Sequence, residues 1–208
     1  MPLAPSRLTG VLLAAGRGRR FDPTGQRSKL LQPLAGGGTV AEASARQLLA
    51  VLPRVVAVVR PGEHVLAAAL GALGCEVCVC PDADLGMAAS LVHAIDYARG
   101  AEGWLIALAD MPFVQAATIA SLAAAVDSVP NGAGIAAPVY RGQRGNPVAF
   151  GHAYLPLLLA LEGDQGARAI LRAHSVREVA VDDGGVLRDI DTPDDLAPPQ
   201  AAPEPEQL

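Results

Sequence analysis

The stretch that decides the fold is Leu8-Thr9-Gly10-Val11-Leu12-Leu13-Ala14, followed at once by Ala15-Gly16-Arg17-Gly18-Arg19-Arg20. The first seven residues form a short apolar run, as expected of a buried strand. Glycines directly after a strand let backbone N–H groups approach a phosphate closely, and Arg17, Arg19 and Arg20 add charged donors. This junction predicts an anion-binding turn at the carboxyl end of the first strand, although by itself it could also be a solvated surface loop.

Two common phosphate-binding motifs do not fit this turn. Gly16 and Gly18 match the first two glycines of a dinucleotide-binding fingerprint, but Phe21 stands in the place of the third. No Gly-Lys-Ser/Thr step follows, so the turn is not a Walker A loop. The missing third glycine also argues against a dinucleotide-dependent oxidoreductase.

The next part of the chain alternates between strand and helix patterns. Strands are predicted at Arg54–Val59, Cys75–Cys80, Trp104–Ala109 and Gly134–Pro138, and helices at Val40–Leu52, Glu63–Leu73, Met87–Arg99 and Thr118–Val126. This alternation is typical of a mostly parallel sheet with helices on both faces, in which ligands bind at the carboxyl ends of the strands. We therefore expect a Rossmann-like, three-layer α/β/α fold.

The pattern changes after Tyr140. The stretch Tyr140–Phe150 predicts a loop or hairpin beside the site, and Asp182-Asp183-Gly184-Gly185 predicts a hairpin turn. The remaining predicted elements are helices at Leu155–Leu161 and Ala167–Ala173 and strands at Val176–Val181 and Val186–Ile190. A single domain is expected over residues 8–197, between an N-terminal tail (1–7) and a disordered Pro/Glu-rich tail (198–208).

Composition narrows the class of protein. The 208 residues are 51% hydrophobic, enough for one α/β domain with a sizeable core. A formal charge of −5 does not indicate a broad basic face for nucleic acid. No apolar run of about 18 residues predicts a membrane span, and no signal peptide is evident, so we expect a cytoplasmic protein. Cys75, Cys78 and Cys80 share one apolar run without clustered histidines, which predicts neither a disulfide framework nor a metal site.

Several charged residues follow predicted strands or loops. Lys29 closes the polar loop before two leucines, so its stem can pack while its ammonium meets a phosphate. Asp110 directly follows a buried strand, where a carboxylate can hold Mg²⁺ that also bridges phosphate oxygens. Asp189 and Asp191 are two apart, so both can face the same way, and one is enough for a metal. The plainer alternatives are a solvated lysine, an aspartate that begins a turn, and Asp191 as a helix cap.

Three weaker signals suggest substrate surfaces. Gly86–Ser90 opens a helix whose free N–H groups favour anions or base carbonyls. Asn146 offers an amide on a constrained loop, and Gly163–Arg168 combines flexible backbone with an arginine that could grip a second phosphate.

Taken together, these positions resemble the MobA-like nucleotidyltransferases, and among them the molybdenum cofactor cytidylyltransferases (MocA-type). The matching motifs, in chain order, are Leu13–Phe21, Lys29–Leu31, Gly86–Leu91, Asp110–Pro112, Gly145–Pro147, Gly163–Arg168 and Asp189–Leu196. They span residues 8–196, nearly the whole chain, and such an ordered set is far more specific than any one motif.

The resemblance implies a nucleotide-diphospho-sugar-transferase-type fold with a small β-hairpin and helical extension. It also implies Mg²⁺- or Mn²⁺-dependent transfer of CMP from CTP to the molybdopterin of the molybdenum cofactor, with a recipient apo-molybdoenzyme or its maturation chaperone as a further partner. By resemblance, Lys29, Arg20 and Asp110 are catalytic, and Asp110 and Asp191 bind the metal. The residues that the resemblance implies for nucleotide binding are Ala14, Ala15, Gly16, Arg17, Gly18, Arg19, Lys29, Gly86 and Ser90. Those that it implies for acceptor binding are Asn146, Asp164 and Arg168.

The preference for CTP depends on Ala15. Guanylyltransferases of this superfamily usually have Leu-Ala-Gly-Gly here, whereas this chain has Leu-Ala-Ala-Gly. The Ala15 methyl narrows the space beside the base and favours a pyrimidine. A GTP-using enzyme, an enzyme acting on a sugar or polyol phosphate, and a non-catalytic molybdenum cofactor carrier remain alternatives, although a carrier would not need Asp110 and Asp191. The long stretch Asp22–Ser28 leaves the conformation around the triphosphate open.

Overall fold

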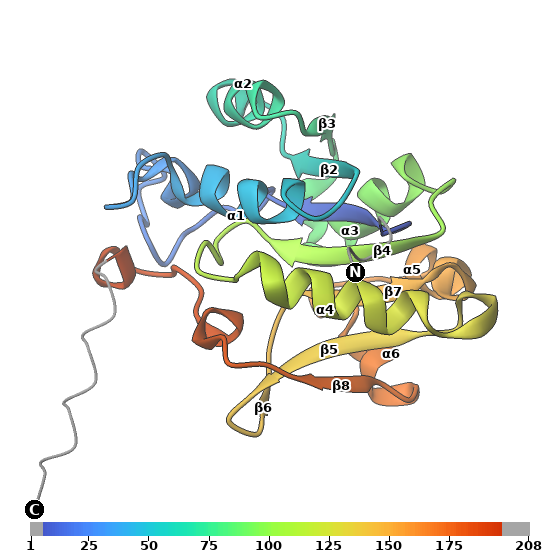
Figure 1. Ribbon diagram of the computed structural model, residues 1–208. Helices are drawn as coiled ribbons and strands as arrows, with labels where there is room; N and C mark the ends of the chain where they lie inside the picture. Colours follow the sequence, from blue (N-terminus) through green and yellow to red (C-terminus); the bar gives the residue numbers. More distant parts are fainter. Residues whose placement is uncertain (1–5, 197–208) are drawn as a thin grey trace, which may run out of the picture.

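A mostly parallel sheet forms the middle layer of the computed structural model, which describes residues 6–196 (Figure 1). Within these residues the sheet has eight strands in the order β3-β2-β1-β4-β7-β5-β6, with β8 paired to β5. The strands are β1 (Thr9–Leu13), β2 (Arg54–Val59), β3 (Glu76–Val79), β4 (Gly103–Leu108), β5 (Ile135–Tyr140), β6 (Gln143–Arg144), β7 (Val148–Gly151) and β8 (Arg177–Ala180). β1 pairs in parallel with both β2 and β4, so the strand that precedes the predicted anion-binding turn lies inside the sheet.

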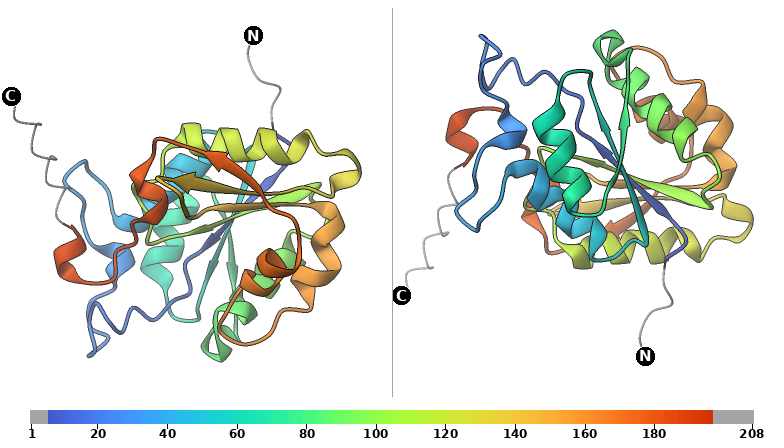
Figure 2. Two further views of the ribbon diagram at one scale, coloured as in Figure 1. Left: turned by 90° about the horizontal axis from the view of Figure 1, so that it is seen from below. Right: turned by 90° about the horizontal axis from the view of Figure 1, so that it is seen from above.

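Helices cover both faces of the sheet, which confirms the predicted three layers (Figure 2). They are α1 (Val40–Leu49), α2 (His64–Ala72), α3 (Met87–Tyr97), α4 (Ala116–Asp127), α5 (Leu155–Leu159) and α6 (Arg168–Ala173). Leu12 of β1 packs in the core cluster with α1, α2 and α4, and Val11 packs in the other cluster with α3, α5 and α6. Neighbouring residues of a strand point to opposite faces, so both faces of β1 must be apolar.

The first helix shows how local sequence sets an element boundary. Thr39 and Glu42 form a capping box: the Thr39 hydroxyl accepts from the Glu42 N–H at 3.4 Å, and the Thr39 N–H donates to Glu42 Oε2 at 2.6 Å. These bonds satisfy two backbone donors that the helix itself leaves without partners. α1 therefore begins at Val40, as the pattern predicts.

The predicted hairpin across Asp182–Gly185 is wrong. β8 pairs in parallel with β5, and residues 184–187 form a 3-10 helix instead of the start of a strand. The cause is Asp183, which is buried and accepts from Gln115 N–H at 2.8 Å and Thr118 Oγ1–H at 2.7 Å. Asp183 therefore caps α4 from a distant part of the chain. Two residues further on, Gly185 packs so closely on the Phe113 carbonyl that a Cβ would collide with it.

A hairpin does form within Tyr140–Phe150. β5 turns into β6 through Arg141 and Gly142, whose φ angles are 49° and 80°. After a cis Asn146-Pro147 bond the chain continues as β7, which lies antiparallel between β4 and β5. The pattern of Tyr140–Phe150 predicted a loop or hairpin, but it did not predict β7, which begins inside this stretch at Val148.

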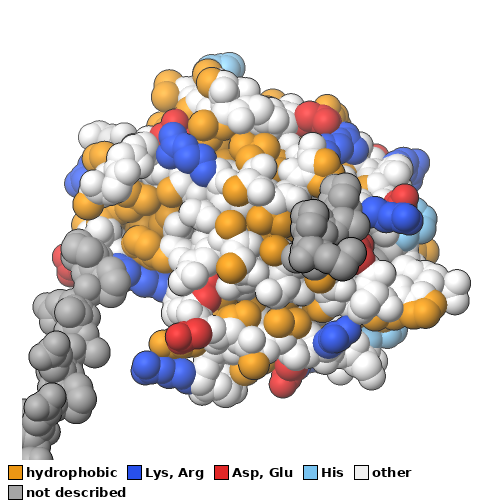
Figure 3. All heavy atoms as spheres, viewed as in Figure 1, with side chains coloured by type: hydrophobic (Ala, Val, Ile, Leu, Met, Phe, Trp, Pro, Cys, Tyr) orange, Lys and Arg blue, Asp and Glu red, His pale blue; other side chains and the backbone are white. Residues whose placement is uncertain are grey.

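The sequence also predicted the absence of a broad basic face, the absence of a membrane span and a disordered C-terminal tail. On the face drawn in Figure 3, Lys and Arg side chains are scattered among acidic ones and do not gather into one basic area. Over the described residues, no helix is long and apolar enough to cross a membrane. The predicted disordered tail at 198–208 lies outside the described residues.

The cysteines allow a first prediction. All are free and buried, and burial raises the pKa of the Cys75 and Cys78 thiols to about 11. At pH 8 only about 0.1% of such a thiol is ionised to the reactive thiolate. We therefore expect the native protein to react with a thiol reagent such as DTNB far more slowly at pH 8 than the same protein in 6 M guanidinium. Rapid modification of a native cysteine at pH 8 would contradict this account.

Candidate active site

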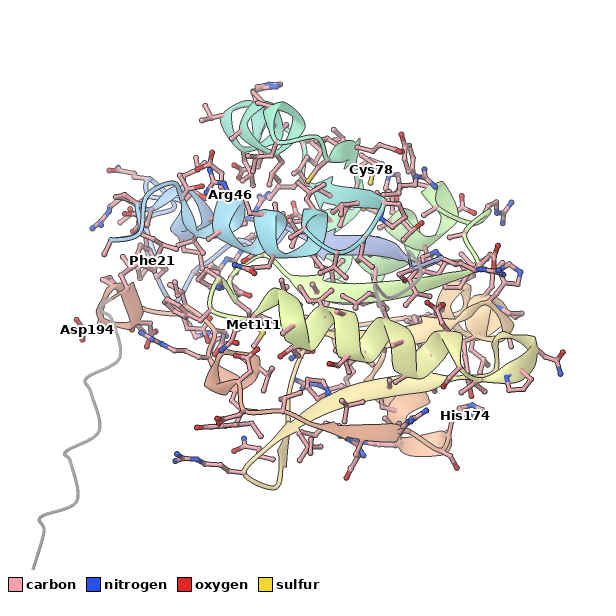
Figure 4. All side chains as sticks on the ribbon, viewed as in Figure 1. Phe21, Arg46, Cys78, Met111, His174 and Asp194 are labelled. Atoms are coloured by element: carbon pink, nitrogen blue, oxygen red, sulfur yellow. The ribbon has the colours of Figure 1, made fainter. Side chains whose placement is uncertain are left out.

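The site forms where the chain leaves β1 and β4. The Ala109 N–H donates to the Leu13 carbonyl at 3.1 Å, which ties together the residues that follow the two strands. Much later in the chain, the Ile190 N–H donates to the Asp110 carbonyl at 2.8 Å. This bond places Asp191 beside Asp110, although 81 residues separate them (Figure 4 shows Asp194 and Phe21 at this same end of the molecule).

The centre of the site is a pair of carboxylates that share one lysine. Lys29 Nζ lies 2.6 Å from Asp110 Oδ2 and 3.2 Å from Asp191 Oδ1. The second oxygen of Asp191 forms an ion pair with Arg20, at 2.6 Å from Nη1. The side chain of Lys29 is only 11% exposed, and those of Asp110 and Asp191 are 20% and 18% exposed, so water screens these charges weakly. Sequence reasoning assigned all four residues to the site, and the structure brings them together.

The donor set of these carboxylates fits a hard divalent cation. Asp110 Oδ1 is buried and has no hydrogen-bond partner among the described residues. Mg²⁺ and Mn²⁺ prefer oxygen ligands and commonly use one or two carboxylates completed by phosphate oxygens and water. In residues 6–196 no group of three or more His, Cys, Asp or Glu side chains is arranged to hold a metal ion. Asp110 and Asp191 are thus two oxygen donors of the kind that such an ion binds.

Asp189 adds a third carboxylate to this region. Burial raises its pKa, and the negative charges of Asp191 and Asp110 raise it further. Asp189 lines the same cleft as both. This concentration of negative charge makes the region attractive to cations.

The turn that follows β1 is shaped by its own side chains. Phe21 is buried, and the guanidinium of Arg27 lies 5.8 Å from the centre of its ring. The Asp22 carboxylate accepts from the N–H groups of Thr24 at 2.9 Å and Arg27 at 2.7 Å. Hydrogen bonds from Thr24 lower the pKa of Asp22. The unusually long stretch Asp22–Ser28 is thus folded back on Asp22 and delivers Lys29 to the carboxylates.

A cleft of about 570 Å³ contains most of the predicted residues. Its lining includes Ala15, Gly16, Arg17, Gly18, Arg19, Arg20, Lys29, Gly86, Ser90, Asp110, Arg168 and Asp191. Residues from the turn after β1, the start of α3, the segment after β4 and the C-terminal segment therefore meet in one space, which is the arrangement that the ordered motifs predicted.

Three predicted residues do not line this cleft. Ala14 is buried beneath the turn, and its N–H donates to the Val58 carbonyl at 3.0 Å. Asn146 lines a separate small cavity with Met111, and the two spaces share Leu108 as a wall. Asp164 lies behind the cleft, against Gly86.

Gly86 joins two of the predicted motifs. Its φ of 119° belongs to the region that favours glycine, and a Cβ there would collide with the Asp164 carboxylate and the Gly163 carbonyl. The Gly163 carbonyl also accepts from the Ala88 N–H at 3.1 Å, in the first turn of α3. The loop that leads to Arg168, the first residue of α6, is therefore packed directly on the start of α3.

Asp84 is a cleft residue that sequence reasoning missed. Arg17 Nε donates to Asp84 Oδ1 at 2.8 Å, and this interaction lowers the pKa of Asp84. Arg60 Nη2 lies 3.7 Å from the same oxygen. Asp84 belongs to no recognisable motif. The one feature of the sequence that could have indicated it is its position shortly after the third predicted strand, Cys75–Cys80.

Comparisons with known proteins show the family to which the chain belongs. Residues 10–179 match the family model of the MobA-like NTP transferase domain. Purine catabolism protein PucB of Bacillus subtilis is 32% identical over 201 residues, which cover 90% of this chain and 93% of PucB. Among solved structures, Rv0371c of Mycobacterium tuberculosis is 33% identical with a TM-score of 0.74, over 90% of this chain and 95% of that one.

Two further structures add detail. A complex of Rv0371c with manganese is 32% identical with a TM-score of 0.70, over 90% of this chain and 95% of that one. A nucleotidyl transferase from Methanothermobacter (Mth528) is 25% identical with a TM-score of 0.76, over 90% of this chain and 93% of that one. These likenesses cover nearly the whole chain and confirm the predicted fold.

Proposed function

Because the chain belongs to the MobA-like NTP transferase family, we propose that it is a cytidylyltransferase that acts on the molybdenum cofactor. The terminal phosphate oxygen of molybdopterin attacks the α-phosphorus of CTP, and the bond from that phosphorus to the bridging oxygen breaks. Pyrophosphate leaves, and molybdopterin cytosine dinucleotide remains. The product is then available to an apo-molybdoenzyme or its maturation chaperone.

The observation that carries this proposal is the cluster of Lys29, Asp110 and Asp191 at the end of the glycine- and arginine-rich turn. Asp110 and Asp191 would hold Mg²⁺ or Mn²⁺, which when bound neutralises phosphate charge. The manganese complex of Rv0371c supports a divalent ion in this family. Transfer of this kind needs positioning and charge neutralisation more than covalent chemistry, and the site offers both.

The remaining residues fall into two groups around this centre. Lys29 and Arg20 contact phosphate oxygens, while Gly16 to Arg19 present backbone N–H groups and guanidinium groups to the triphosphate. Gly86 and Ser90 face the nucleoside from the start of α3. Arg168 grips the acceptor phosphate, and Asp164 holds its loop against Gly86. An acceptor that extends along Leu108 would reach Asn146.

The base preference follows from Ala15. This residue is buried and lines the cleft directly after the strand, so its methyl takes space that a purine would need. We expect wild-type turnover to be higher with CTP than with GTP, and Ala15→Gly to narrow that difference by about tenfold, since one methyl group in a pocket changes discrimination by about 1–3 kcal/mol. The measurement is pyrophosphate release with each of the four NTPs, Mg²⁺ and molybdenum cofactor. A strong preference of the wild type for GTP would sink the assignment of CTP.

The same assay separates the other classes of protein. Turnover with a sugar phosphate or polyol phosphate, but not with molybdenum cofactor, would identify a different acceptor. Binding of the cofactor without pyrophosphate release from any NTP would identify a carrier. The Asp84→Ala variant is a matched control for Asp110→Ala, because Asp84 lines the same cleft but does not contact Lys29 in the structure.

A further inference from the structure

Three of the cations proposed to bind phosphate, Lys29, Arg20 and Arg17, are paired with carboxylates of the chain itself. Lys29 contacts Asp110 at 2.6 Å and Asp191 at 3.2 Å, and Arg20 contacts Asp191 at 2.6 Å. Arg17 is paired in the same way, but with Asp84, which also lines the cleft. The carboxylates of the first group are the ones proposed to hold the metal, whereas Asp84 is not.

Lys29 and a metal ion would compete for the same two carboxylate groups, those of Asp110 and Asp191. Both carboxylates hold the Lys29 ammonium group, at 2.6 Å from Asp110 Oδ2 and 3.2 Å from Asp191 Oδ1, and it would repel a second cation bound to them in this weakly screened site. The Lys29 side chain is only 11% exposed, so its charge is not screened by bulk water. A metal ion by itself must therefore displace a well-held ammonium.

A triphosphate removes this conflict. The stem of Lys29 runs along the turn: a Cβ built on Gly18 would lie 3.4 Å from Lys29 Cγ. Lys29 therefore needs to move only its flexible end to leave the carboxylates and meet phosphate oxygens held by that turn. Arg20, whose side chain is 76% exposed, can follow from Asp191 to the same phosphates.

We propose that Lys29 couples metal binding to nucleotide binding, by occupying Asp110 and Asp191 until a metal–triphosphate complex takes its place. This inference rests on the proposed metal-dependent nucleotidyl transfer. Lys29 is thus both a phosphate ligand and the group that keeps the metal site weak without nucleotide. Because coupling is reciprocal, the metal must strengthen nucleotide binding by the same factor as the nucleotide strengthens metal binding.

The test measures Mn²⁺ binding by EPR, with and without the non-hydrolysable analogue α,β-methylene-CTP. In the wild type we expect the analogue to tighten Mn²⁺ binding by about 100-fold, within the usual range of coupling between sites. Lys29→Met keeps the packed stem and removes the charge. Without nucleotide, this variant should bind Mn²⁺ about tenfold more tightly than the wild type, and the tightening by the analogue should fall to about tenfold or less.

Arg17→Met is the matched control because it removes one positive charge from the same cleft without touching the proposed metal carboxylates. It should leave Mn²⁺ affinity without nucleotide unchanged within about twofold, since the charge of Arg17 is paired with Asp84 and its side chain is 44% exposed, against 11% for Lys29. Lys29→Gln, checked by circular dichroism, gives a second neutral variant if the methionine variant misfolds.

Each outcome has a definite meaning. If Lys29→Met and Lys29→Gln bind Mn²⁺ without nucleotide no more tightly than the wild type, the coupling role is overturned. Equal tightening in Arg17→Met would also overturn it, because the effect would then come from total charge. If the wild type binds no Mn²⁺ with or without the analogue, the proposed metal-dependent function itself fails, which is a result distinct from loss of coupling alone.

Discussion

Replacing Asp110 with alanine is expected to lower the rate of nucleotidyl transfer by about a thousandfold while the fold stays intact. The loss of one well-positioned charge or hydrogen-bond donor at a reacting phosphate typically lowers the rate by about a thousandfold, which corresponds to about 4 kcal/mol of transition-state stabilisation. In this protein the loss would remove the carboxylate with the buried, unpaired oxygen and leave Asp191 as the remaining carboxylate on Lys29. Steady-state pyrophosphate release with saturating Mg²⁺ and CTP gives the measurement.

The control for Asp110→Ala is Asp84→Ala, which removes another carboxylate from the same cleft. This variant should retain activity within about tenfold, because Asp84 acts on Arg17 and not on the proposed metal. The melting temperature of Asp110→Ala should lie within about 4 °C of the wild type, equivalent to about 1 kcal/mol. Near-normal rates in the folded Asp110→Ala variant would remove Asp110 from the metal role.

Replacing Asp183 with alanine is expected to destabilise the protein by about 3 kcal/mol, through a residue that no motif contains. Asp183 is buried and accepts hydrogen bonds from Gln115 N–H, Thr118 Oγ1–H and Gly185 N–H at 2.8, 2.7 and 3.0 Å. Removal of the carboxylate leaves these donors without their partner in a buried place, and each such loss costs about 1–3 kcal/mol before relaxation. Urea unfolding followed by circular dichroism measures the change in the free energy of unfolding.

The neighbouring Asp182 provides the control, because it is exposed. Asp182→Ala should change the free energy of unfolding by less than about 0.5 kcal/mol, as is usual for surface positions. Equal midpoints for the two variants would show that Asp183 does not anchor this segment. Because the same segment leads on to Ile190 and Asp191, Asp183→Ala should also weaken activity at temperatures near its lowered melting point.

The meeting of the candidate residues in one cleft could be predicted from the sequence best where their placement is local. Gly16 to Arg20, Lys29 and Asp110 each stand directly at the end of a strand or loop, and the carboxyl ends of neighbouring parallel strands meet at one edge of a sheet. Their meeting in one cleft therefore follows from the order of the elements. Asp84 and the role of Asp22 could not be predicted in this way, because each depends on which side chains lie opposite in space.

The strand–helix alternation and the junction from Leu8 to Arg20 were enough to determine the three-layer fold, the edge of the sheet that carries the site and most of its residues. Apolar periodicity and glycine placement are local properties, so they can be read from neighbouring residues. The tertiary structure decided the antiparallel insertion of β7, the path of residues 182–191 and the pairing of Lys29 with two carboxylates. These features arise from contacts between residues far apart in the chain, such as Asp183 with Gln115 and Ile190 with Asp110, and no local pattern records such partners.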